Sequence, residues 1–144
     1  MILPSQIEAA VVQMLANAAT VGGQGVHVER DAPLPGEPVL NGWVGVYHER
    51  MNLPPRALGM GAGSRKQVIG LAMIIQASHA ASGADCSDTL DDLLNRVLDV
   101  ILDDPTITGL AQTLDDAINV DYKLYDKSSS LFVQEALVRF SVIV

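Results

Sequence analysis

The chain has 144 residues, of which 49% are hydrophobic and only 18% are charged, and its formal net charge is −8. A chain of this length can build one core, so the small scaffolds that need disulfides or a metal to fold are excluded. Its single cysteine, Cys86, cannot form a disulfide within the chain. We therefore expect one domain over residues 1–144, with part of its weakly charged surface covered by another subunit.

The charges are segregated along the sequence. Five acids and five bases precede residue 81, whereas twelve acids and four bases follow it, so the whole net −8 lies in the second part. An acidic net field repels nucleic acid, and no pattern of interleaved basic and aromatic residues offsets it. The sequence therefore disfavours nucleic-acid binding, although it allows an acidic surface past which DNA slides.

Neither a signal peptide nor a membrane span is expected. The first residues lack a basic segment followed by an apolar run. Two long uncharged runs, between Glu8 and Glu29 and between Lys66 and Asp85, are each interrupted by polar residues. A bilayer demands about 20 consecutive apolar residues, which neither run provides.

The first helix is predicted from about Ser5 to about Thr20. Ser5-Gln6-Ile7-Glu8 has the pattern of a capping box, in which two side-chain oxygens accept from free backbone amides. Apolar residues then recur at helical spacing: Ile7, Ala10, Val11, Met14, Leu15 and Ala18. Gly22-Gly23 ends the helix, and the alternation in Val26–Arg30 predicts a strand.

Two further strands are predicted on either side of a long loop. Val39–His48 is rich in aromatic and β-branched residues. Gln67–Ala77 is apolar nearly throughout, as in a central strand, although a buried helix has the same composition. Prolines and glycines exclude regular structure from Glu49 to Ser64, and a loop of more than about 12 residues is usually functional or disordered.

The second helix is the clearest element of the sequence. Ser87 is predicted to cap it, and Pro105 stops it. Its apolar residues form one stripe: Leu90, Leu93, Leu94, Val97, Leu98 and Ile101. After a possible helical turn within 106–117, alternating residues from Ile118 to Tyr125 and from Leu131 to Val144 predict a hairpin. We therefore expect an α+β fold, a mostly antiparallel sheet of about five strands with both helices on one face.

No enzyme emerges from the chemistry-bearing residues. His27, His48 and His79 lie in different predicted elements without metal-ligand spacing, and no metal or cofactor is expected. The thiol of Cys86 lies near a helix start, yet a lone cysteine is usually a packing residue. The glycines of residues 59–63 suggest a phosphate loop, but no strand precedes them and no helix follows.

Two charged groups are candidates for contacts. The basic group concentrates around the long loop, where a subunit or partner contact and a solubilising role are both open; it comprises Arg50, Arg56, Arg65 and Lys66. The acidic group lies on the second helix, where solvated carboxylates are routine; it comprises Asp91, Asp92, Asp99 and Asp103. Trp43 and Tyr47 share a strand face, where core packing is favoured over binding.

Four segments together suggest a family. They are Trp43–Tyr47 (WVGVY), Pro55–Gly59 (PRALG), Asp88–Leu94 (DTLDDLL) and Leu102–Leu110 (LDDPTITGL), the last followed by a terminal hairpin. In this order they resemble the tail terminator, or tail completion, proteins of long-tailed bacteriophages.

The resemblance implies an α+β structural protein of the virion, without catalysis. Such a protein forms a hexameric ring on the head-proximal end of the tail tube, ends tube polymerisation and joins the head-tail connector. Genomic DNA would pass through the lumen, which the acidic group could face, and assembly would take place in the host cytoplasm. The alternatives are a neck or joining protein, or a small acidic ligand-binding domain or enzyme with a ligand near His48, Asp85 and Cys86.

Overall fold

The computed structural model describes residues 2–30, 41–52, 67–79, 82–124 and 132–144. The elements in chain order are α1 (Pro4–Asn17), the 3₁₀ turn η1 (Gly22–Gln24), β1 (His27–Arg30), β2 (Trp43–Asn52), β3 (Val68–His79), α2 (Gly83–Asp103), β4 (Thr113–Leu124) and β5 (Phe132–Ile143). Helices and strands do not alternate regularly, which agrees with the expected α+β class.

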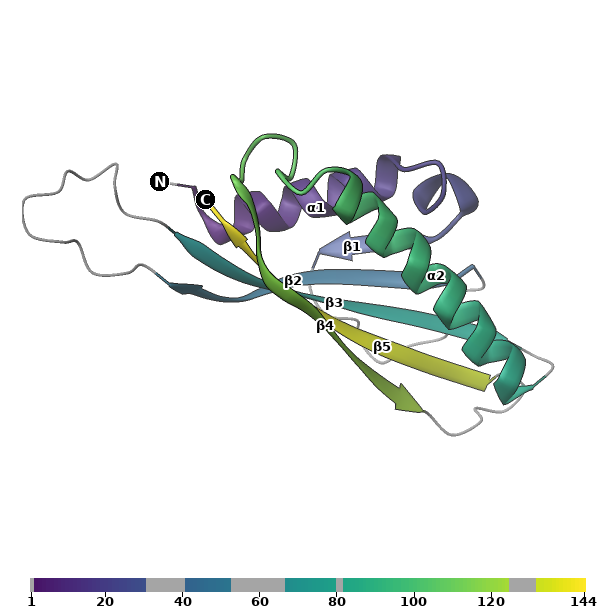
Figure 1. The fold of residues 1–144 in the computed structure, drawn as a ribbon. Coiled ribbons are helices and arrows are strands. Elements are labelled where there is room, and N and C mark those ends of the chain that lie inside the picture. The colour runs from purple at the N-terminus through teal and green to yellow at the C-terminus, as the bar shows by residue number, and fades with distance from the viewer. Residues whose placement is uncertain (1, 31–40, 53–66, 80–81, 125–131) are drawn as a thin grey trace, which may run out of the picture.

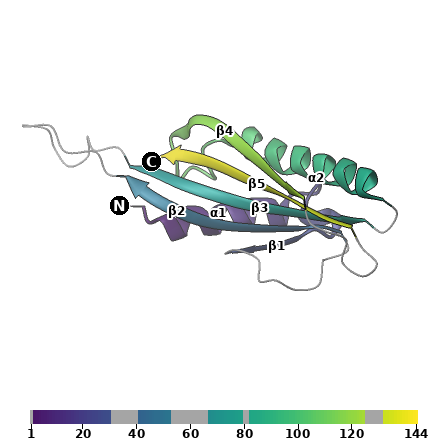
Figure 2. The same cartoon turned by 90° about the horizontal axis from the view of Figure 1, so that it is seen from below.

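The five strands form one sheet in the order β1-β2-β3-β5-β4. Only β1 and β2 are parallel, and every other neighbouring pair is antiparallel. Both helices lie on the same face, α1 over β1 and β2 and α2 over β3 and β5 (Figure 1). Seen from below, none of the described helices lies on the opposite face of the sheet (Figure 2). The predicted sheet, the hairpin partners β4 and β5, and the placement of both helices are confirmed.

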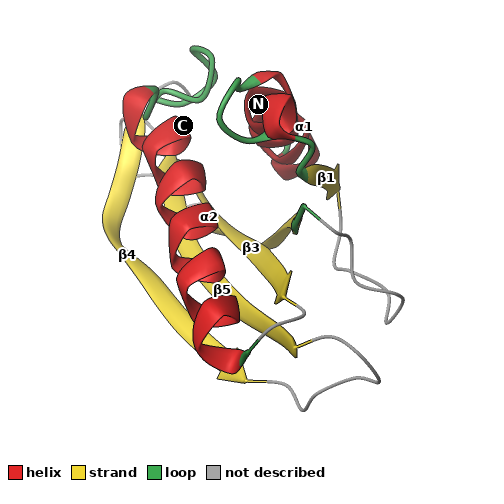
Figure 3. Ribbon diagram, turned by 90° about the vertical axis from the view of Figure 1, so that its right-hand side faces the viewer, coloured by secondary structure: helices red, strands yellow, loops and turns green. Residues whose placement is uncertain are grey.

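The core lies between the sheet and the helices. Along β3 the odd-numbered residues Ile69, Leu71, Met73 and Ile75 are fully buried and belong to the core. Their partners on β5 are Val142, Phe140, Val138 and Ala136, so two adjacent strands present one continuous apolar surface. The buried stripe of α2 closes the core from above, and Figure 3 shows this helix crossing the sheet. Residues of even number in β3 face the helix-free side.

Helix α2 begins earlier than predicted. The Ser82 hydroxyl, and not that of Ser87, accepts from the backbone amide of Asp85 at 3.0 Å and caps the helix. Ser87 lies inside the helix and donates to Gln134 on β5 at 2.7 Å. Cys86 is therefore within the first turns and fully buried. The predicted stripe is otherwise confirmed.

The predicted capping box of α1 is wrong. The helix begins at Pro4, and the side-chain oxygen of Gln6 accepts from the backbone amide of Leu3 at 2.7 Å. Glu8 does not reach back to the helix start, because it is buried against the sheet with 6% of its surface exposed. The helix also ends at Asn17, three residues before the predicted end.

Strand boundaries differ from the prediction at two places. Strand β2 continues to Asn52, so Glu49 and Arg50 are in a strand and not in the predicted loop. A register shift between His48 and Arg50 accommodates the extra residue. Strand β4 begins at Thr113 and contains a second register shift, between Asp115 and Asn119, where a helical turn was one expectation. Residues 39–40 and 53–66 lie outside the described residues.

Candidate interaction surfaces

A buried carboxylate joins α1 to one edge of the sheet. Glu8 accepts from Nε of Arg30 on β1 at 2.9 Å, and from the backbone amide of His48 on β2 at 3.1 Å. Its Oε2 also lies 2.6 Å from Nδ1 of His48. The Glu8 side chain is 8% exposed, whereas those of Arg30 and His48 are about half exposed. Glu8, Arg30 and His48 form what we call the Glu8 cluster.

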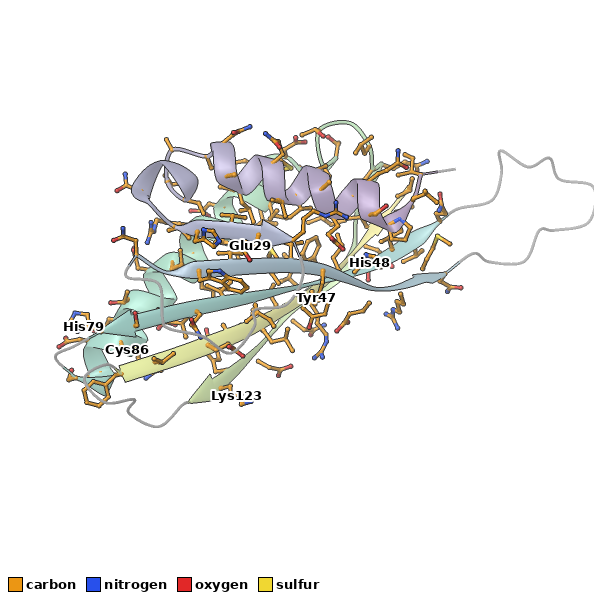
Figure 4. All side chains as sticks on the ribbon, turned by 180° about the vertical axis from the view of Figure 1, so that it is seen from behind. Glu29, Tyr47, His48, His79, Cys86 and Lys123 are labelled. Carbon is orange, nitrogen blue, oxygen red and sulfur yellow. The ribbon has the colours of Figure 1, made fainter. Side chains whose placement is uncertain are left out.

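The Glu8 cluster marks the place where β1 stops. Strand β1 pairs with β2 as far as Arg30 and Val46. Beyond this pair, the backbone amide of His48 donates to the Glu8 carboxylate. A groove of about 480 Å³ lies here, lined by Glu8, Arg30, Tyr47 and His48. Figure 4 labels Tyr47 and His48, consecutive residues of β2 that lie opposite Ala72 and Leu71 of β3 and so belong to opposite faces of the sheet. The groove therefore lies along an edge of the sheet where a carboxylate, and not a strand, accepts from the backbone amide of His48.

The sequence contained a signal for this cluster that the prediction missed. Glu8 stands three and seven residues before Val11 and Leu15, on the buried stripe of α1. A carboxylate in such a stripe needs partners, because burying an unpaired charge is costly. The sequence could not name those partners, which lie 22 and 40 residues further along the chain.

The helix-free face of the sheet, which we call the open face, carries an ion-pair network at its centre. Nε of Arg139 on β5 lies 3.2 Å from Glu49 on β2, and its Nη1 lies 3.6 Å from Asp121 on β4. Burial and the nearby carboxylate of Glu49 raise the pKa of Tyr47, while Arg139 opposes the shift. The network joins charged side chains of three strands, β2, β5 and β4, across the middle of the open face.

Trp43 also lies on the open face. It is 7% exposed and stacks on His27 of β1, with ring centroids 6.4 Å apart. It shares this face with Tyr47, as the alternation predicted. The core lies between the sheet and the helices, and Trp43 is not part of it. Trp43 is buried, as expected for core packing, but on the other face of the sheet.

Of the predicted basic group, only Arg50 lies among the described residues; Arg56, Arg65 and Lys66 do not. Arg50 is exposed and stands opposite Gly70 of β3. Its Cγ lies so close to Gly70 that a Cβ there would come within 2.9 Å, so the stem of Arg50 lies across bare backbone. The side chain borders a cleft of about 340 Å³ on the open face, together with Asp115, Arg139 and Ser141.

The predicted acidic group is brought together on the outer side of α2. Asp91, Asp92, Asp99 and Asp103 are all exposed, opposite the buried stripe. Asp92 pairs with Arg96, whose Nη1 donates to the Thr20 carbonyl oxygen at 2.8 Å and ties α2 to the turn after α1. We call these four aspartates the acidic stripe.

The ligand site considered near His48, Asp85 and Cys86 is not assembled. Figure 4 places His48 and Cys86 toward opposite ends of the sheet. The Cys86 thiol donates to the carbonyl oxygens of Ala77 and Phe132, and burial raises its pKa. Within the described residues no group of His, Cys, Asp and Glu is suited to a metal ion, and no helix has the length and apolar character needed to cross a membrane.

The last of the four segments that resemble the tail terminator family, residues 102–110, contains a strained turn between α2 and β4. Ile107 and Thr108 have positive φ angles of 48° and 57°, which β-branched residues rarely adopt. The Asp104 carboxylate accepts from the Thr106 hydroxyl at 2.6 Å and from the Thr108 amide at 3.0 Å. The first of these bonds is the main cause of the lowered pKa of Asp104. Ile107 is fully buried, so the turn anchors the end of α2 to the core.

Among known proteins, the chain is similar to solved structures only at the level of the fold. No protein-family model matches the chain, and no curated protein matches it. A similar solved structure is a chain described as "Virion of native gene transfer agent (GTA) particle", with 16% identity and a TM-score of 0.46. The match covers 95% of this chain and 94% of the other. At this TM-score and identity, the likeness carries no conclusion about function.

Proposed function

We propose that this chain is a structural protein of a phage-like virion, and that it forms a ring that caps the tail tube. Its ring is a homo-hexamer that contacts the tube protein below and the head-tail connector above, at the head-proximal end of the tail. It acts by assembly and not by catalysis. The proposal rests on the sequence resemblance to tail terminator proteins, whose α+β fold this chain shares.

The observation that carries the proposal is the large sheet surface that none of the described helices covers, on a chain of which only 18% is charged. One face of the sheet is helix-free, and β4 pairs on one side only among the described residues. In the part of the chain that the structure describes, four large hydrophobic residues are exposed: Leu3, Met51, Leu102 and Tyr122. Subunits of a ring bury such surfaces against identical neighbours.

The acidic stripe fits a lumen through which DNA passes. Four exposed carboxylates on one helix repel phosphates, so DNA moves past them without binding. Replacing all four aspartates of the stripe by lysine is expected to leave rings intact but to slow DNA ejection. Replacement by asparagine is the matched control, with an intermediate effect. Unchanged ejection in both variants would remove the stripe from the lumen.

The function is tested by growing tubes from the tail tube subunit of the same phage with and without this chain. The chain is expected to bind one end of each tube and stop its growth, which electron microscopy measures as a fixed and shorter length. A neck or joining protein would instead bind the head connector and leave tube growth unchanged. Failure to bind either partner would contradict a role in the virion.

A further inference from the structure

Strand β4 forms an edge of the sheet. Among the described residues it pairs with β5 alone, and an edge strand presents backbone amide and carbonyl groups to a further strand. The register with β5 is regular from Asn119 to Leu124, and the register shift of β4 lies before this part, between Asp115 and Asn119. Such a shift bends a strand and interrupts pairing. The straight part of the edge, residues 119–124, is therefore the part that suits another strand.

The straight part of β4 combines an aromatic ring with two opposite charges. Tyr122 lies opposite the core residue Ala136 and therefore on the helix-covered face. It is 62% exposed, because α2 packs over β3 and β5 and leaves the edge strand uncovered. Asp121 and Lys123, on either side of Tyr122, lie on the open face, and Figure 4 shows Lys123 on β4 at the border of the sheet. The side chain of Asp121 is 74% exposed.

This edge is complementary to itself. When two copies pair their β4 strands antiparallel about a two-fold axis at Tyr122, residues at equal distances from Tyr122 lie opposite each other. Asp121 of each copy then lies opposite Lys123 of the other, which gives two pairs of opposite charge on the open face. The two Tyr122 rings lie opposite each other on the helix-covered face. Opposite charges and aromatic rings are both favourable as direct cross-strand pairs. The charge pattern therefore favours a second copy of this chain as the occupant.

Neighbouring registers lack this match. An axis at Asp121 or at Lys123 sets two identical charges opposite each other, which is destabilising. An axis at Val120 sets Asp121 opposite Asn119, without a charge pair. The axis at Tyr122 is therefore the favoured register on the straight part of the edge. It also leaves the contact between Asp121 and Arg139 in place, because Arg139 is on β5 of the same copy.

We propose that two copies of this chain, when free in solution, pair through β4 about a two-fold axis at Tyr122 and so join their five-stranded sheets edge to edge. The pairing covers a strand edge that is otherwise a site for aggregation. A two-fold contact uses the same surface on both copies and is complete with two subunits, whereas a ring needs a contact between different surfaces. The inference therefore goes beyond the ring proposed above and does not rest on it.

Cysteine cross-linking tests the position of the axis. In a C86A background, Y122C places two thiols opposite each other, where the Cβ atoms of a cross-strand pair are about 4.5–5.5 Å apart. Mild oxidation is expected to give a covalent dimer. N119C is the matched control on the same edge, because its two thiols are about 20 Å apart along the strands and should not react with each other. No dimer from Y122C, or equal amounts from both variants, would overturn the pairing.

A charge swap tests the register. D121K sets lysine opposite lysine, and K123E sets glutamate opposite Asp121, so each variant alone is expected to weaken dimerisation about tenfold or more in sedimentation equilibrium. An equimolar mixture of the two variants pairs opposite charges at both positions and should restore the dimer. Recovery on mixing cannot come from a change in folding, because each variant is the same molecule alone and in the mixture. No recovery would overturn the pairing.

The wild-type protein gives the simplest readout. Its sedimentation is expected to show a dimer whose fraction grows with concentration. A wild-type chain that stays monomeric at every concentration would overturn the pairing, and it would leave the ring at tube ends to its own test. A ring that forms while Y122C gives no covalent dimer would likewise overturn the pairing alone.

Discussion

The two faces of the sheet are built on different principles. The helix-covered face is a continuous apolar surface in which Ile69, Leu71, Met73 and Ile75 are fully buried. The open face combines Trp43 and other apolar groups with the ion pairs of Arg139. The first face determines whether the chain folds, because burial dominates stability. The second determines what the folded chain contacts, and substitutions should separate the two roles.

The largest effect is expected in the core. Leu93→Ala on α2 removes a side chain that is 1% exposed, and a substitution of this kind costs about 2–5 kcal/mol. Ile74→Ala on the open face, where the side chain is half-buried, is the matched control and should cost less than half as much. Urea unfolding followed by circular dichroism measures both. Equal losses would mean that the open face is part of the core.

The next largest effect is expected at the Glu8 cluster, which joins α1 to one edge of the sheet. Glu8→Gln removes the charge that holds Arg30 and His48, and it should lower the free energy of unfolding by about 1–3 kcal/mol. Glu29→Gln, on an exposed neighbour of His27, is the control and should change stability by less than about 0.5 kcal/mol. A Glu8→Gln variant as stable as the wild type would show that the cluster does not hold α1 to the sheet.

A smaller effect with a distinct pH dependence is expected at the turn after α2. The folded state lowers the pKa of Asp104, so its contribution is fully present above the unfolded pKa and is lost as pH falls through the folded pKa. Asp104→Asn should therefore be less stable than the wild type at neutral pH, and the difference should shrink as the solution is acidified below about pH 4. Thermal unfolding at several pH values measures it. A constant difference would contradict the assigned hydrogen bonds.

The smallest effect on stability is expected on the acidic stripe. Asp99→Asn changes an exposed carboxylate and should alter the free energy of unfolding by no more than about 0.5 kcal/mol. Calorimetry at neutral pH measures it, with Asp104→Asn as the sensitive comparison. A large loss of stability would mean that the stripe is part of the fold and not a free surface.

Local patterns predicted what depends on near neighbours in the chain. The stripe of α2, the apolar run of β3 and the hairpin of β4 and β5 were predicted because periodicity is a local property. The role of Glu8 was not, because it depends on contacts 22 and 40 residues away. Ser87 directly precedes the stripe and is therefore predicted as the cap, whereas in the structure the Ser82 hydroxyl accepts from the backbone amide of Asp85.

We propose that this chain works as one subunit of a ring. Native mass spectrometry of the purified protein, alone and mixed with tail tubes, tests this most directly. We predict a closed assembly of identical subunits, six in number, that forms in solution or at tube ends. A monomer under both conditions would contradict the claim.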